Sequence, residues 1–124
     1  MKSVLSLIAL LLFSTLAFAD GEHTEDVCST KNIQICAHLG HMENLEPGKA
    51  GSFVAHITGP AETFNMSIIL WMPSMGHGTA PVSVGQFAVN KYFVTNAQFI
   101  MKGQWSVQLR FVADGDSHLI EIPL

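Results

Sequence analysis

The sequence QWSVQLRFVAD, residues 104–114, decides the fold class because apolar and polar side chains alternate along it. The apolar members are Trp105, Val107, Leu109 and Phe111, and the polar members are Ser106, Gln108 and Arg110. A period of two residues is typical of a β-strand with one face in a core and the other toward solvent. The segment therefore predicts a half-buried strand whose polar side chains point outward.

Further segments also predict strands, either because apolar and polar residues alternate or because β-branched and aromatic residues are frequent. None shows a sustained helical period. Their residue ranges are 32–38, 51–59, 62–72, 91–101 and 117–124. Turns rich in glycine and proline separate them, including Gly59-Pro60 and the loop at 73–81. Short strands between turns predict one all-β domain, an antiparallel β-sandwich of six or seven strands. An up-and-down barrel is the alternative architecture.

The N-terminal segment MKSVLSLIALLLFSTLAFAD has the features of a secretory signal peptide. Lys2 begins it, an apolar run follows, and Ala17 and Ala19 fit the small-x-small cleavage rule. Cleavage after Ala19 would give a signal peptide (1–19), a flexible acidic tail (20–27) and a β-sandwich domain (28–124). An uncleaved anchor is the alternative, but serine and threonine interrupt the run, whereas a membrane span needs about 20 apolar residues. We expect no retained transmembrane helix and a periplasmic or secreted protein.

The net charge excludes some classes of partner, and the number of cysteines predicts their redox state. Cleavage would leave five basic and ten acidic residues, a balance that argues against nucleic acid or an anionic membrane surface as partner. Cys28 and Cys36 are the only cysteines, with seven residues between them. In an exported protein such a pair predicts a structural disulfide. The spacing is not C-x-x-C, so thiol-disulfide exchange is not expected.

Catalytic motifs are missing from the sequence. The chain has no G-x-S-x-G elbow, no H-E-x-x-H motif, no P-loop and no dinucleotide-binding fingerprint. Its carboxylates lie mostly in the acidic tail and in turns, where solvated charges are common. We therefore expect that this protein is not an enzyme.

Metal binding is the chemistry that the sequence favours. The segment LWMPSMGHGTAP, residues 70–81, places Met72, Met75 and His77 close together on a loop. Thioether sulfur is a soft, neutral ligand that prefers Cu(I), while imidazole accepts either oxidation state of copper. The segment CAHLGHM adds a second candidate cluster, His38, His41 and Met42, for which surface placement without metal is the alternative.

For several histidines and methionines, a place in the core or on the surface is the alternative to metal binding. Met66 continues an apolar strand face and is expected in the core, and Met72 on the same face is expected equally as core or as ligand. Met101 continues the apolar face of its own strand, but it ends that strand where it can reach a loop at the same end of the sandwich. His56 and His118 are expected to face solvent.

Two motifs resemble the FixH/YtkA-like family of small exported or membrane-anchored β-sandwich domains. The first motif is a strand ending in M-P-x-M-G-H, and the second is an aromatic strand closing on an M-x-G-x-W turn. The matching residues are Met72, Pro73, Met75, Gly76, His77, Tyr92, Phe99, Met101, Gly103 and Trp105. The similarity covers residues 50–124. It implies an immunoglobulin-like sandwich of about seven strands that is associated with copper.

The resemblance also implies a copper site and a class of partner. It suggests Met72, Met75, His77 and Met101 as metal ligands, and FixH members act with copper-transporting ATPases in oxidase assembly. We therefore expect a periplasmic Cu(I) carrier or assembly factor whose partner is a copper transporter or an oxidase-assembly protein. The alternative is a metal-free immunoglobulin-like interaction module of the cell envelope. That alternative predicts that the loop packs against Trp71 or Trp105.

Overall fold

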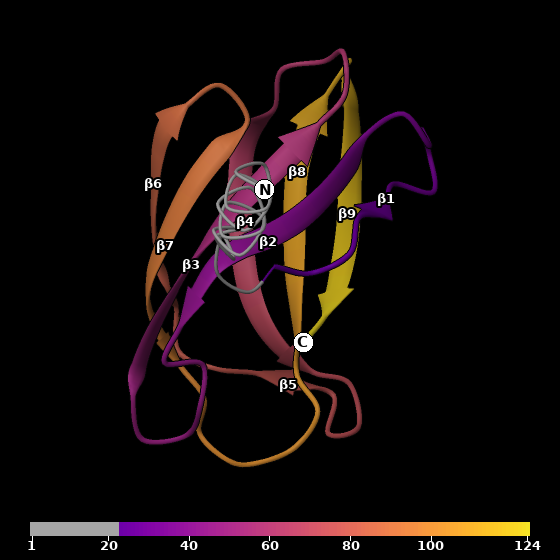
Figure 1. Cartoon of the computed structure of the whole chain (residues 1–124). Helices are drawn as coiled ribbons and strands as arrows, with labels where there is room; N and C mark the ends of the chain where they lie inside the picture. Colours follow the sequence, from indigo (N-terminus) through magenta and orange to yellow (C-terminus); the bar gives the residue numbers. More distant parts are fainter. Residues whose placement is uncertain (1–22) are drawn as a thin grey trace, which may run out of the picture.

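A computed structural model describes residues 23–124, which form two antiparallel sheets packed face to face (Figure 1). The strands of the described chain are β1 (Val27–Cys28), β2 (Cys36–Glu43), β3 (Ala50–Thr58), β4 (Phe64–Met72), β5 (His77–Gly78), β6 (Ser83–Ala88), β7 (Lys91–Gln98), β8 (Ser106–Ala113) and β9 (Asp116–Pro123). One sheet has the order β1-β2-β3-β7-β6 and the other the order β5-β4-β8-β9. Because β1 and β5 have two residues each, seven longer strands remain, and the predicted all-β sandwich is confirmed.

The predicted signal peptide, residues 1–19, lies outside the described residues. Within residues 23–124 there is no helix long and apolar enough to cross a membrane. The described part of the predicted tail pairs with the sheet, because Thr24 N donates a hydrogen bond of 2.8 Å to Leu39 O. The segment that enters β1 therefore runs beside β2.

The core lies between the two sheets and comes from the inward side of each alternating strand. On β3 these residues are Phe53, Ala55 and Ile57, and on β8 they are Val107, Leu109 and Phe111, all buried as the alternation predicts. Burying one large apolar side chain contributes about 1.5–3 kcal/mol. The two-residue period thus gives each sheet one apolar face, and packing these faces together stabilises the sandwich.

The outer side of β8 differs from the prediction. Ser106 and Gln108, expected to face solvent, are buried, with exposed fractions of 3% and 6%. Because β8 pairs with β4 on one side and β9 on the other, side chains of its neighbours cover it. Gln108 Nε2 donates to Glu121 Oε1 (2.9 Å), and Arg110 donates to Gln108 Oε1 (3.0 Å). Gln108 is thus buried with its amide bonded to two charged side chains, and Ser106 Oγ donates to Trp71 O over 3.5 Å.

The start of β4 also departs from its alternation. Phe64 alternates in step with Ile68 and Leu70, but it is 55% exposed, whereas those two residues are buried. The pairing with β8 shifts register between Phe64 and Ser67, and Asn65 has φ +54. An irregularity of this kind changes the face on which the residues before it lie.

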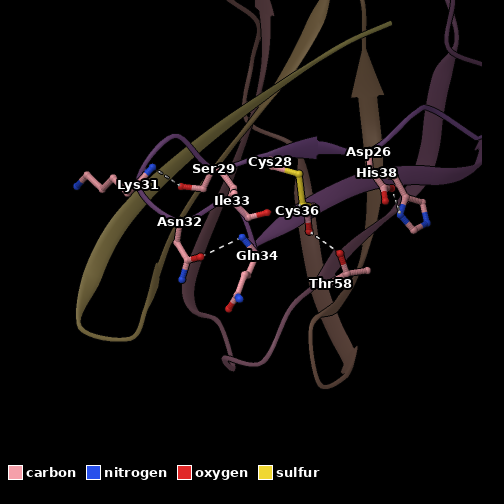
Figure 2. Close-up of a disulfide and its surroundings, with 10 residues drawn as sticks. All are labelled: Asp26, Cys28, Ser29, Lys31, Asn32, Ile33, Gln34, Cys36, His38 and Thr58. Carbon is pink, nitrogen blue, oxygen red and sulfur yellow. Dashed lines mark hydrogen bonds and ion pairs between the residues drawn. A yellow bond between two sulfur atoms is a disulfide. The ribbon is translucent and has the colours of Figure 1, made fainter.

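The predicted disulfide is confirmed between Cys28 on β1 and Cys36 on β2, which stand opposite each other (Figure 2). Ser29 Oγ, next to it, lies 2.6 Å from Nδ1 of His118 on β9. Because Nε2 of that ring faces Ala113 O over 3.3 Å and a carbonyl only accepts, Nδ1 of the neutral ring accepts from Ser29. The prediction that His118 faces solvent was wrong, because this ring is 4% exposed and stacks on Phe111. His118 shares its face of β9 with Ile120 and Ile122, which point into the core.

Removing the disulfide is expected to lower the free energy of unfolding by about 2–3 kcal/mol, the loop-closure entropy of a crosslink of this sequence separation. The variant is Cys28→Ser/Cys36→Ser, and the measurement is urea unfolding at equilibrium. Adding a reductant should destabilise the natural sequence by the same amount and leave the serine variant unchanged. Equal stability of oxidised protein and serine variant would contradict a stabilising role for the crosslink.

Candidate metal-binding site

The turn between β4 and β5 aligns two of the predicted ligands. Met72 and His77 are direct partners in the antiparallel pairing, so their side chains project to the same side of the hairpin. The amides of Met75 and Gly76 both donate to Met72 O, over 3.1 and 3.0 Å. Gly76 has φ +66, which glycine adopts without steric cost. We call residues 72–77 the Met/His loop.

A second loop, residues 99–105 between β7 and β8, lies against the Met/His loop at one end of the sandwich, the lower end in Figure 1. Met72 is 3% exposed, and a Cβ atom added to Gly103 would stand 2.7 Å from Met72 Cε. Gly103 also has φ +147. The absence of a side chain at position 103 therefore allows the loop to close over the methionine, and Met72 is a core residue at the base of this end.

Trp105 joins the two loops. Its Nε1 donates to Met101 O over 3.0 Å, and its ring meets Phe99 edge to face at a centroid distance of 5.3 Å. The ring of His77 approaches Trp105 at 6.5 Å between centroids. The indole thus contacts the Met/His loop on one side and holds the backbone of Met101 on the other.

The imidazole of His77 is half-buried and has a defined tautomer when neutral. Its Nδ1 lies 3.2 Å from Gly78 O. A carbonyl oxygen only accepts, so Nδ1 carries the hydrogen and the lone pair is on Nε2. Metal-binding histidines are commonly oriented in this way by a bond from the other ring nitrogen. Nε2 of His77 is therefore the ring atom available to a ligand.

The remaining two thioethers are accessible. Met75, at the tip of the Met/His loop, is 58% exposed. Met101 is 41% exposed, so the prediction that it continues an apolar inward face was wrong: β7 ends at Gln98 and the chain turns away after Phe99. The Met/His loop and the neighbouring loop thus offer one buried and two exposed sulfur atoms and one imidazole nitrogen.

The second predicted cluster divides between two places. His38 and His41 line a hollow of about 390 Å³ on the outer side of the five-stranded sheet, together with His23 and His56. Met42 packs against the core and lines a different pocket. We call the first place, lined by His23, His38, His41 and His56, the histidine hollow.

Sequence reasoning missed His56 as a partner of His38. Alternation along β3 placed His56 on the outer face, and it is half-buried there. Its position opposite His38 depends on the pairing register of β2 and β3, which no local pattern reveals.

In residues 23–124, no three imidazole, thiolate or carboxylate groups already meet in an arrangement that would hold a metal ion.

No family model, curated protein or solved structure matches this chain. The resemblance to the FixH/YtkA-like family is therefore an interpretation of two short motifs.

Proposed function

We propose that this protein binds Cu(I) at the end of the sandwich formed by the Met/His loop and the 99–105 loop, and that it acts as an exported copper carrier or assembly factor. The observation that carries the proposal is the register of the β4–β5 hairpin. It pairs Met72 with His77, and Gly103 and Trp105 bring the loop containing Met101 against them. The four proposed donors thus come from two loops that touch.

The donor set suits the monovalent ion. Methionine sulfur is soft and uncharged, and His77 offers Nε2 because Nδ1 bonds to the backbone. Both cysteines are in the disulfide, so thioether and imidazole are the soft donors left to an exported domain. Met72 is fixed in the core, while Met75 and Met101 are exposed. Exposed ligands can exchange with those of a second protein, which a carrier requires.

An anaerobic Cu(I) competition titration tests this function. The site variant is Met75→Leu/His77→Gln/Met101→Leu, which removes the exposed sulfurs and the imidazole and leaves the buried Met72 in place. We expect the natural protein to bind one equivalent with submicromolar affinity. The site variant should bind at least about a hundredfold more weakly, a loss of about 2.7 kcal/mol.

The matched control is Met42→Leu/Met66→Leu, which removes two thioethers that pack against the core elsewhere. Methionine and leucine have similar volumes, so both variants should remain folded, as a thermal unfolding curve checks. The control should bind Cu(I) as the natural protein does. Equal and weak binding by all three proteins would reject the proposal.

A second candidate function is a metal-free interaction module, and two observations favour it. The ring of His77 in the Met/His loop lies against Trp105, as this alternative predicts. Strand β6 is an edge strand exposed along its whole length, and apolar side chains are exposed around its turn with β7. Phe87, Val89 and Phe93 are 59%, 63% and 44% exposed. Exposed apolar groups at a free sheet edge are common where another protein binds. Failure of the copper titration would leave this function as the better explanation.

A further inference from the structure

Four side chains form a row across the outer face of the five-stranded sheet. Asp26 immediately precedes the pair Val27–Ala37, which places it beside His38. His38 is the direct partner of His56 on β3, and His56 is the direct partner of Lys91 on β7. Residues directly opposite in adjacent strands have Cβ atoms about 4.5–5.5 Å apart. The row therefore brings a carboxylate and two imidazoles within contact of one another.

The contacts within the row leave one nitrogen unsatisfied. The rings of His38 and His56 meet edge to face, with centroids 5.0 Å apart. Nδ1 of His38 is 3.1 Å from Oδ1 of Asp26 (Figure 2). This contact is not a hydrogen bond, and within residues 23–124 Nδ1 is shielded from solvent and has no hydrogen-bond partner. A shielded polar atom without a hydrogen bond is energetically unfavourable, so a ligand at this position would be stabilising.

His23 closes the histidine hollow from the side of β2. A Cβ atom added to Gly40 would lie 4.0 Å from Cβ of His23, so the missing side chain of Gly40 opens the space beside that ring. Two hydrogen bonds hold Thr24, the residue after His23, against β2. Thr24 N donates to Leu39 O and Leu39 N donates to Thr24 Oγ1, both over 2.8 Å. The position of His23 next to the row is thus fixed by the backbone.

We propose that the histidine hollow binds one divalent transition-metal ion, Zn²⁺ or Cu²⁺, through His38 and His56, with Asp26 and His23 completing the coordination. Imidazole nitrogen and carboxylate oxygen bind such ions at about 2.0–2.2 Å, and two opposed imidazoles can reach one ion by side-chain rotation. Because the histidine hollow offers no sulfur ligand, the metal ions that it prefers differ from those that the Met/His loop prefers. The two sites would therefore hold different ions.

The groups around His56 act on its pKa in opposite directions. Burial lowers the pKa of His56, and His38 and Lys91 lower it further, while Asp26 acts in the opposite direction. Asp26 supplies a negative charge next to His38 that partly balances the ammonium of Lys91.

Titration of the purified protein with Zn²⁺, followed by NMR of the imidazole groups, tests the site. Thioethers bind Zn²⁺ poorly, so this probe separates the hollow from Cu(I) binding at the Met/His loop. The resonances of His38 and His56 should shift together up to one equivalent. The His38→Gln/His56→Gln variant should bind more than about a hundredfold more weakly, because losing even an outer partner of a ligand costs about 10–100-fold.

Asp26→Asn should weaken zinc binding by about tenfold or more. Its matched control is Glu62→Gln, which neutralises an exposed carboxylate elsewhere and should leave the affinity unchanged. Thermal unfolding with a chelator present checks that every variant is folded. The proposal is overturned if His38 and His56 do not shift with zinc, or if the double glutamine variant binds zinc as the natural protein does.

Discussion

Replacing Asn90 by alanine should lower the free energy of unfolding by about 2–5 kcal/mol, as measured by urea unfolding. Asn90 is 8% exposed, and its Oδ1 accepts from both N and Oγ1 of Thr63, over 2.8 and 2.9 Å. Its Nδ2 donates to Ala61 O over 2.9 Å. The variant would leave the amide of Thr63, a residue 1% exposed, without a partner, at a cost of about 1–3 kcal/mol.

The backbone of Asn90 adds a second cost. Its φ of +59 lies in the left-handed region, which asparagine tolerates and in which alanine costs about 1–2 kcal/mol. Asn96 is the matched control, since it has the same φ of +59 but an exposed side chain that bonds only to Gln98. Asn96→Ala should therefore lose about 1–2 kcal/mol. Equal losses at positions 90 and 96 would show that the buried bonds of Asn90 add nothing.

The sequence predicted the parts of the fold that depend on local pattern. Alternation along residues 104–114 and 51–59 identified the inward faces of β8 and β3, because the side-chain period of a strand is a property of the strand alone. The pairing of Cys28 with Cys36 was also predictable, since each had one possible partner. The prediction that the outer face of β8 is solvent-exposed was wrong. Gln108 is buried there because it bonds to Glu121, a residue on another strand.

The two candidate metal sites also differ in whether local sequence or strand pairing brings their residues together. The Met/His loop could be predicted because its donors are close in sequence, and the hairpin register keeps Met72 and His77 together. The partner of His38 could not, because His56 is on another strand and only the register of β2 with β3 brings them together. Met42, adjacent to His41 in sequence, packs against the core and lines a different pocket, so the structure does not bring it into the histidine hollow.

Replacing Trp105 by alanine should lower the free energy of unfolding by about 3–5 kcal/mol, the range for removing a buried aromatic side chain. Trp105 is 6% exposed and packs on Phe99, so its removal would leave a cavity at the end of the sandwich. It would also free Met101 O, which Nε1 holds at 3.0 Å. Urea unfolding measures the loss. Trp71 on β4 is the matched control, because its side chain is only half-buried.

The comparison of the two tryptophans also tests whether Trp105 organises the proposed copper site. Trp71→Ala should cost clearly less stability than Trp105→Ala. Trp105→Phe keeps an aromatic ring beside Phe99 and His77 but lacks the donor to Met101 O, so it should recover much of the stability. Its Cu(I) affinity should nevertheless fall, because Met101 is then no longer held against the Met/His loop. Unchanged Cu(I) affinity in Trp105→Phe would mean that the indole bond has no part in positioning the thioether, and that Trp105 acts only as a core side chain.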